Sequence, residues 1–286
     1  MKGLACSAVM ALAFLCPNWI AASPITLEGA LAKGYVELDA TGLGGYSGEV
    51  LKVKLKNLYK KDLEVTIPAG QIFEVGDSSL QNLMVAKEET LLVESGKIRI
   101  AKLHTFCIEA RDGSPGEGSS FRVGKMAVGN LLAFAQYLSL ENLYKNAYAQ
   151  NAVWAVSDDE RLEGIGDQAL AKYVANLLGK PEPQYHVQYQ QPDQSRLLPG
   201  SPVWEMQEAL SMNGLFYYTL DSDRLVNFEL YNEEGEMVHA FSKNRQQKRG
   251  YHKFRFEFKI SNLPKGKYFA RLTSGGRTIE ELPVEF

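Results

Sequence analysis

The sequence predicts a mainly β protein with a helical segment. We expect an N-terminal β-sandwich with added helices, an α+β unit, followed by a C-terminal immunoglobulin-like β-sandwich. Apolar and polar residues alternate along short segments in both end regions, as in strands with one buried face. Between these regions the apolar spacing becomes that of helices. Strands followed by a run of helices favour an α+β unit over alternating βαβ units.

The first 22 residues have the features of a signal peptide. Lys2 precedes an apolar run from Leu4 to Leu15, and residues 20–22 fit a cleavage site before Ser23. The run is too short to span a membrane, and no later segment approaches spanning length. We therefore expect an exported protein, secreted or on the cell surface, with no transmembrane segment in its mature form.

Composition limits the classes of function. Of the 286 residues, 45% are hydrophobic and 23% are charged, values that are ordinary for a globular protein. The part after the signal peptide is long enough for about two domains. The net charge of −3 and the absence of a basic groove pattern argue against nucleic acid as a partner.

The first predicted domain, residues 23–180, begins with strands. Leu51, Val53 and Leu55 alternate with lysines. Further short apolar runs follow at 63–67, 72–73, 83–85, 91–93 and 98–100. Turn residues separate these runs, which is typical of an antiparallel sandwich. A Gly/Ser/Pro loop is expected at 112–120.

Helices are predicted after this loop. Leu131, Phe134, Ala135 and Leu138 lie at helical spacing, and the same spacing recurs from Leu170 to Leu177. Residues 147–156 are expected to be helical too. Gly179 is a typical helix stop.

Residues 181–203 are rich in proline and glutamine and poor in apolar residues. This composition predicts an extended, semi-rigid linker. A loop packed along a domain is the alternative. Strand patterns resume in the second predicted domain, 204–286, where Phe254, Phe256 and Phe258 alternate with charged residues.

The last 80 residues or so resemble the C-terminal sorting domain of type IX secretion. The resemblance rests on 228–238, which contain a Gly turn, and on 260–272, which contain Leu-Pro-Lys-Gly-Lys-Tyr. It covers about 205–286 and implies delivery to the cell surface or medium, with the secretion machinery as a partner. The chain ends in an acidic segment, 280–286, where such domains end in basic residues. An ordinary structural sandwich is the alternative.

One cysteine remains after removal of the predicted signal peptide. Cys6 and Cys16 lie within that peptide, so Cys107 has no partner within the mature chain. An unpaired thiol in an exported protein is explained by inert burial, by a reactive role or by an intermolecular disulfide.

Two motifs in region 100–160 resemble those of bacterial thioester-domain surface adhesins. Residues 106–108 are Phe-Cys-Ile, and residues 149–154 are Ala-Gln-Asn-Ala-Val-Trp. The resemblance implies an internal thioester between Cys107 and Gln150, with Phe106 and Trp154 as supporting packing. A thioester acylates an amine or hydroxyl of a target. Its target would be a surface protein or glycan.

We therefore expect an adhesin-like protein that captures a target covalently and once, and is not an enzyme. The alternative is a non-catalytic surface structural or interaction protein with a buried, inert cysteine. A hydrolase that uses Cys107 has weak support, because no histidine spacing requires a dyad. The histidines lack ligand spacing, and His104 and Cys107 would point to opposite faces of one strand. No metal site and no cofactor are expected.

Overall fold

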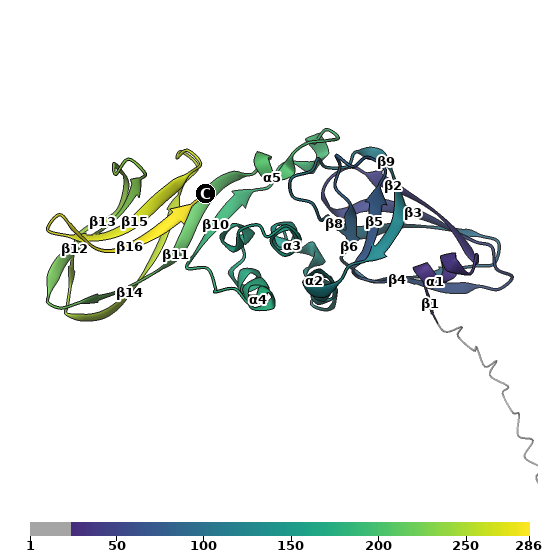
Figure 1. The fold of residues 1–286 in the computed structure, drawn as a ribbon, viewed down its shortest axis with the longest axis horizontal. Coiled ribbons are helices and arrows are strands. Elements are labelled where there is room, and N and C mark those ends of the chain that lie inside the picture. Colours follow the sequence, from purple (N-terminus) through teal and green to yellow (C-terminus); the bar gives the residue numbers. More distant parts are fainter. Residues whose placement is uncertain (1–23) are drawn as a thin grey trace, which may run out of the picture.

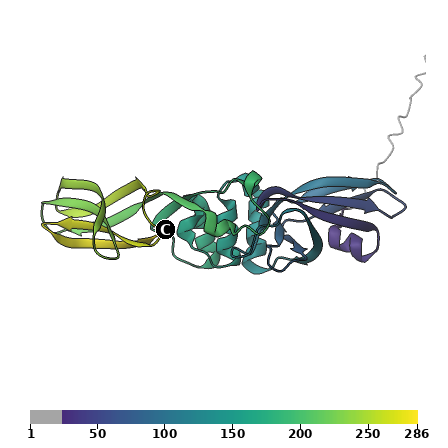
Figure 2. The ribbon, with the colours of Figure 1, turned by 90° about the horizontal axis from the view of Figure 1, so that it is seen from above.

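The computed structural model describes residues 24–286, so the predicted signal peptide lies outside the described residues. The protein is mainly β with a small helical part. Figures 1 and 2 show an elongated molecule, with a β-barrel region at one end, helices in the middle and the C-terminal strands at the other end.

The predicted N-terminal sandwich is replaced by a closed six-stranded barrel. The barrel strands, in spatial order, are β2 (Val36–Leu43), β3 (Ser47–Asn57), β8 (Ile98–Cys107), β6 (Leu83–Val85), β5 (Gln71–Val75) and β9 (Glu117–Met126). The barrel closes because β9 pairs with both β5 and β2. β9 begins inside the segment predicted as a loop, which is therefore wrong from Glu117 onward.

A second, small sheet accompanies the barrel. It contains β1 (Ile25–Thr26), β4 (Leu63–Ile67) and β7 (Glu89–Val93). Helix α1 (Leu27–Ala32) follows β1 directly, and the Thr26 side chain accepts a hydrogen bond from Gly29 N at its start. Side chains of the barrel, this sheet and α1 share one apolar core.

The three helices predicted after the strands are all present. They are α2 (Gly129–Leu140), α3 (Ala149–Ser157) and α4 (Gln168–Leu178). Two short 3₁₀ turns lie between them, η1 (Leu143–Lys145) and η2 (Leu162–Ile165). Asp167 caps α4 by accepting from Leu170 N, and Gly179 ends it in the left-handed conformation, with φ of 66°. The helices pack on a second apolar core that also contains Phe106 from β8.

The C-terminal region consists of two sheets. The first contains β10 (Tyr185–Gln190), β11 (Glu208–Leu220) and β14 (Gly250–Lys259). The second contains β13 (Met237–Gln247), β12 (Arg224–Asn232), β15 (Lys267–Ser274) and β16 (Arg277–Glu285). Apolar side chains from both sheets form a third core.

The segment predicted as a linker is ordered along much of its length. Its residues 185–190 form β10, which pairs antiparallel with β11. Residues 191–207, here called the strap, contain η3 (Gln194–Arg196) and α5 (Val203–Met206). The strap returns to the barrel, where Gln194 Oε1 accepts from Tyr46 N at 3.1 Å and Gly200 N donates to Ser114 O at 2.9 Å.

The end of β16 lies beside the helical region and not at the far tip of the molecule (Figure 1). Glu285 Oε2 pairs with Arg161 Nη1 at 2.8 Å, and Glu285 N donates to the Tyr185 hydroxyl at 3.0 Å. These contacts fix the last strand to the start of β10 and to the segment between α3 and η2.

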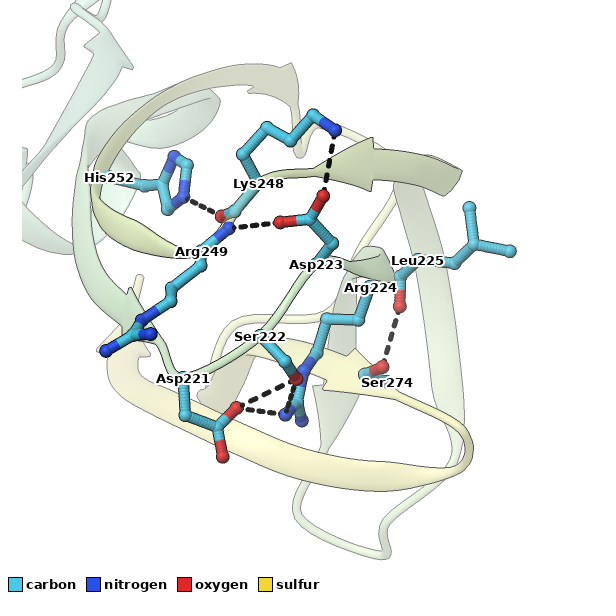
Figure 3. Close-up of polar contacts among 9 residues, drawn as sticks. All are labelled: Asp221, Ser222, Asp223, Arg224, Leu225, Lys248, Arg249, His252 and Ser274. Atoms are coloured by element: carbon cyan, nitrogen blue, oxygen red, sulfur yellow. Dashed lines mark hydrogen bonds and ion pairs between the residues drawn. The ribbon is translucent and has the colours of Figure 1, made fainter.

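Polar side chains hold the turns of the C-terminal sheets together at the opposite end (Figure 3). Asp223 accepts from Lys248 Nζ and from Arg249 N, both at 2.8 Å, and so joins the β11–β12 turn to the β13–β14 turn. Ser274 Oγ donates to Leu225 O at 2.7 Å. The tip is thus held by hydrogen bonds between two turns and between the strands β15 and β12.

Candidate functional site

The structure brings the side chain of Gln150 onto the backbone of Cys107. Gln150 Oε1 accepts a hydrogen bond from Cys107 N at 3.1 Å, and Gln150 Nε2 donates to Cys107 O at 2.8 Å. Cys107 N also donates to Tyr46 O at 3.0 Å. The amide group is therefore fixed in position and orientation at the cysteine.

Strand β8 carries Cys107 and helix α3 carries Gln150, and the packing of α3 on β8 brings the two residues together. Cys107 is the last residue of β8, and its side chain belongs to the barrel core. Phe106 points to the other side of the strand and packs with Ala149 and Ala152 in the helical core. The small alanines allow α3 to lie close to β8, so the longer Gln150 side chain reaches the strand backbone.

The site excludes water. Cys107 is 0% exposed and Gln150 is 1% exposed. Burial, reinforced by the negative charge of Glu109, raises the pKa of the Cys107 thiol well above its ordinary value. Burial and the neighbouring thiol raise the pKa of Tyr46 to about 12. Both groups are therefore neutral at physiological pH.

Trp154 forms one wall beside the cysteine. It lies one turn after Gln150 on α3, is 0% exposed and belongs to the same core as Cys107. Its indole Nε1 donates to Gln81 Oε1 at 3.1 Å, and Gln81 Nε2 donates to Asp112 O at 2.9 Å. The hydrogen bonds fix the ring and satisfy its polar atom.

Two carboxylates lie just beyond the cysteine. Glu109 accepts from Asn82 N at 2.7 Å and from Asn82 Nδ2 at 2.8 Å, and Asp158 accepts from Ala110 N at 2.8 Å. Burial raises the pKa of both carboxyl groups above their ordinary values, although these hydrogen bonds oppose the shift. They anchor the chain that follows Cys107 to β6 and to the end of α3.

The strap covers the site from outside. The Trp204 ring contacts Trp154 edge-to-face, with centroids 5.7 Å apart, and Val203 is fully buried in the barrel core. Gln207 Nε2 donates to Asn151 Oδ1 at 2.8 Å, while Asn151 Nδ2 donates to Gln207 Oε1 at 3.3 Å. The strap therefore closes over α3 at the residue next to Gln150.

Sequence reasoning missed several residues around the pair. Tyr46, Gln81 and the strap residues Trp204 and Gln207 come from three separate parts of the chain and belong to no motif. Only Trp204 carried a signal, because a large aromatic residue within a polar, proline-rich segment needs a packing partner.

The described residues were also searched for a metal site and for a membrane-spanning helix. Among residues 24–286, no three His, Cys, Asp or Glu side chains are placed to hold a metal ion. In the same range no helix has both the length and the apolar character needed to cross a membrane.

The chain was compared with protein-family models, with curated proteins and with solved structures, and it matches none of them.

Proposed function

We propose that Cys107 and Gln150 form an internal thioester through which this protein captures a target covalently. The observation that carries the proposal is the pair of hydrogen bonds that hold the Gln150 amide on Cys107, at 3.1 and 2.8 Å. In the reaction Cys107 Sγ bonds to Gln150 Cδ and the bond from Cδ to Nε2 breaks. The thiol proton goes to the departing nitrogen, which leaves as ammonia.

The hydrogen bond from Cys107 N supports this reaction. It lies on Oε1, the oxygen that gains negative charge when sulfur adds to the amide carbon. A fixed backbone donor at that oxygen stabilises the tetrahedral intermediate in a site that excludes water. Burial of Gln150 protects the resulting acyl group from hydrolysis.

Capture of a target completes the proposed function. An amine of a surface protein, or a hydroxyl of a glycan, attacks Gln150 Cδ and displaces Cys107 Sγ as a thiol. The protein is then bonded to its target through the Gln150 side chain. Because the thioester is not regenerated, each molecule reacts once and the protein is not an enzyme.

Intact mass tests the proposal. The protein purified after export should be lighter than the mass calculated from its mature sequence by about 17 Da, the mass of ammonia. Incubation with methylamine should instead make it heavier than the sequence mass by about 14 Da. Cys107→Ala and Gln150→Ala should show neither change, while Gln168→Ala, at an exposed helix start, should behave as wild type.

A full-mass wild-type protein with one titratable thiol after unfolding would reject the thioester. That result would favour the alternative, a non-catalytic surface structural or interaction protein with an inert cysteine. The same two hydrogen bonds support this alternative, because they leave both polar atoms of the buried Gln150 amide satisfied.

We propose further that the C-terminal sheets form an immunoglobulin-like sandwich and act as a type IX sorting domain that places the protein on the cell surface. The resemblance over 205–286 and the shared core of the two sheets support this. A folded reporter with this chain's first 22 residues and residues 181–286 should then be exported across the outer membrane. The start at 181 keeps β10, which pairs with β11. A reporter retained in the periplasm would reject the sorting role.

A further inference from the structure

We propose that a groove between α4 and the sheet β10–β11–β14 binds an uncharged saccharide. The groove consists of two adjoining hollows of about 660 and 310 Å³. Both are lined by Gln168, Glu182, Pro183, His186 and Asn213, so they form one continuous depression. Their volumes lie within the range of small-molecule sites, ~300–1,000 Å³.

The floor of the groove is a row of polar residues across three strands. The strand register places His186 opposite Asn213, and Asn213 opposite Glu257. Directly opposed residues lie on the same face of a sheet. An imidazole, an amide and a carboxylate therefore lie side by side on a fixed surface, where they offer both hydrogen-bond donors and acceptors.

His186 is a buried polar group with an unused hydrogen-bonding atom. Its side chain lines both hollows, the residue is 5% exposed, and its Nδ1 has no partner within residues 24–286. An unsatisfied buried nitrogen reduces stability, and such atoms are uncommon in folded proteins. Its position in the floor of a groove indicates a site that is completed by a ligand.

The charges of the lining exclude a strongly charged ligand. Lys172 pairs with Glu182 at 2.8 Å, and Asp167 already caps α4. Arg255 and Glu257 remain, one of each sign, on the β14 side of the groove. Three carboxylates and two cations therefore leave the groove with a single net negative charge, which disfavours an anion and is too small to select a strongly charged cation.

The chemistry of the remaining lining fits a sugar. Few aliphatic side chains line the groove, which argues against a lipid or another apolar ligand. Tyr148 lines one hollow and Tyr217 lines the other. Tyrosine rings offer an apolar face with a polar edge, and sugar rings have the same mixed character. A lining that combines such rings with amides and carboxylates suits a chain of neutral sugar units.

The groove is separate from the Cys107–Gln150 pair, because neither residue lines it. The proposal therefore does not depend on the thioester. Binding should be the same in wild type and in Cys107→Ala, which distinguishes failure of one proposal from failure of the other.

The experiment is an array of neutral oligosaccharides built from glucose, mannose, galactose or N-acetylglucosamine, with sialyllactose and a heparin hexasaccharide as acidic probes. The full mature chain is used, and the strongest neutral binder is then titrated calorimetrically. We expect Asn213→Ala to weaken binding about tenfold, the effect of losing one good hydrogen bond. Thr219→Ala, exposed on the same strand and outside the groove, should change the affinity less than about twofold.

Nuclear magnetic resonance of the wild-type protein provides a second measurement that needs no variant. The neutral saccharide should shift the signals of the His186 ring and the Asn213 side-chain amide. The proposal is overturned if no neutral saccharide binds at millimolar concentration or if only acidic probes bind. It is also overturned if binding leaves these two signals, or the affinity of a folded Asn213→Ala variant, unchanged.

Discussion

Asn151 and Gln207 exchange two hydrogen bonds through their side-chain amides, at 2.8 and 3.3 Å. Both residues are buried, and they join the helix that carries Gln150 to the end of the strap. This amide pair fastens the strap over the candidate site, since Trp204 lies three residues before Gln207 and packs on Trp154.

The first prediction concerns the Asn151–Gln207 amide pair. Gln207→Ala removes both hydrogen bonds and leaves the Asn151 amide partly unsatisfied, so the strap should open more often. The rate at which methylamine consumes the thioester, or at which a thiol reagent labels Cys107 if no thioester forms, should rise about tenfold. Arg196→Ala, a matched strap variant with a side chain that is 86% exposed, should leave the rate unchanged. Equal rates in the two variants would show that the amide pair does not control access.

The second prediction separates the hydrogen bonds from the thioester. In Cys107→Ala no thioester can form, but the backbone at position 107 still binds Gln150. Adding Gln150→Ala to this background should lower the free energy of unfolding by about 1–3 kcal/mol, because a buried carbonyl loses its donor. Urea unfolding measures this change. Gln168→Ala in the same background should have little effect, and a similar loss there would contradict the assignment.

The third prediction concerns the wall of the site. Trp154→Phe keeps an aromatic ring but removes the donor to Gln81 Oε1. The unsatisfied oxygen and the smaller ring should together lower the free energy of unfolding by about 2–4 kcal/mol. Trp204→Phe keeps an aromatic contact and breaks no hydrogen bond to Gln81, so its effect should be smaller. Chemical denaturation of both variants tests the order, and the reverse order would reject it.

The fourth prediction is a pH dependence of stability. Burial lowers the pKa of His186, although Glu163 and Asp167 partly oppose the shift. The folded protein therefore binds fewer protons at His186 than the unfolded chain does. Its stability should fall as pH decreases through about 6.5, the ordinary histidine pKa.

His186→Gln should flatten this dependence in thermal unfolding followed between pH 5 and 8. Burial also lowers the pKa of His104, so His104→Gln should remove a separate part of the same dependence. If a variant with both His186→Gln and His104→Gln shows the wild-type dependence of thermal stability on pH, neither imidazole is responsible for it.

Local patterns in the sequence were sufficient to predict a mainly β protein and its three main helices. Period-two alternation around Val53 and helical spacing around Phe134 both reflect which side of an element is buried. The barrel was not predictable in this way. Its closure depends on pairing of β9 with β2 and β5, and strand alternation does not reveal which strands are neighbours.

Composition misled the interpretation of two segments. Glycines and serines near 117–120 indicated a loop where β9 begins. Prolines on both sides of 185–190 hid the alternation of Tyr185, Val187 and Tyr189, which all belong to β10. In each case tertiary pairing outweighed local preference.

For the site, the two motifs identified residues that the fold brings together. Cys107 and Gln150 contact each other because a strand end and a helix are adjacent, as the order of elements suggested. Whether they form a thioester stays a prediction. The cover over the site was not predictable: Trp204 indicated that it needs a packing partner, but which partner depends on the return path of the strap, and Gln207 carried no signal.

That return path has a consequence for the timing of maturation. Residues 203–207 follow the barrel and α3 in the sequence, so Gln150 can reach Cys107 before the strap covers Trp154. If the proposed thioester forms, its departing ammonia would have the freest exit at this early stage. Once Trp204 and Gln207 are in place, small molecules would reach the bond only when the strap opens, so the order of folding would favour formation first and slow consumption later.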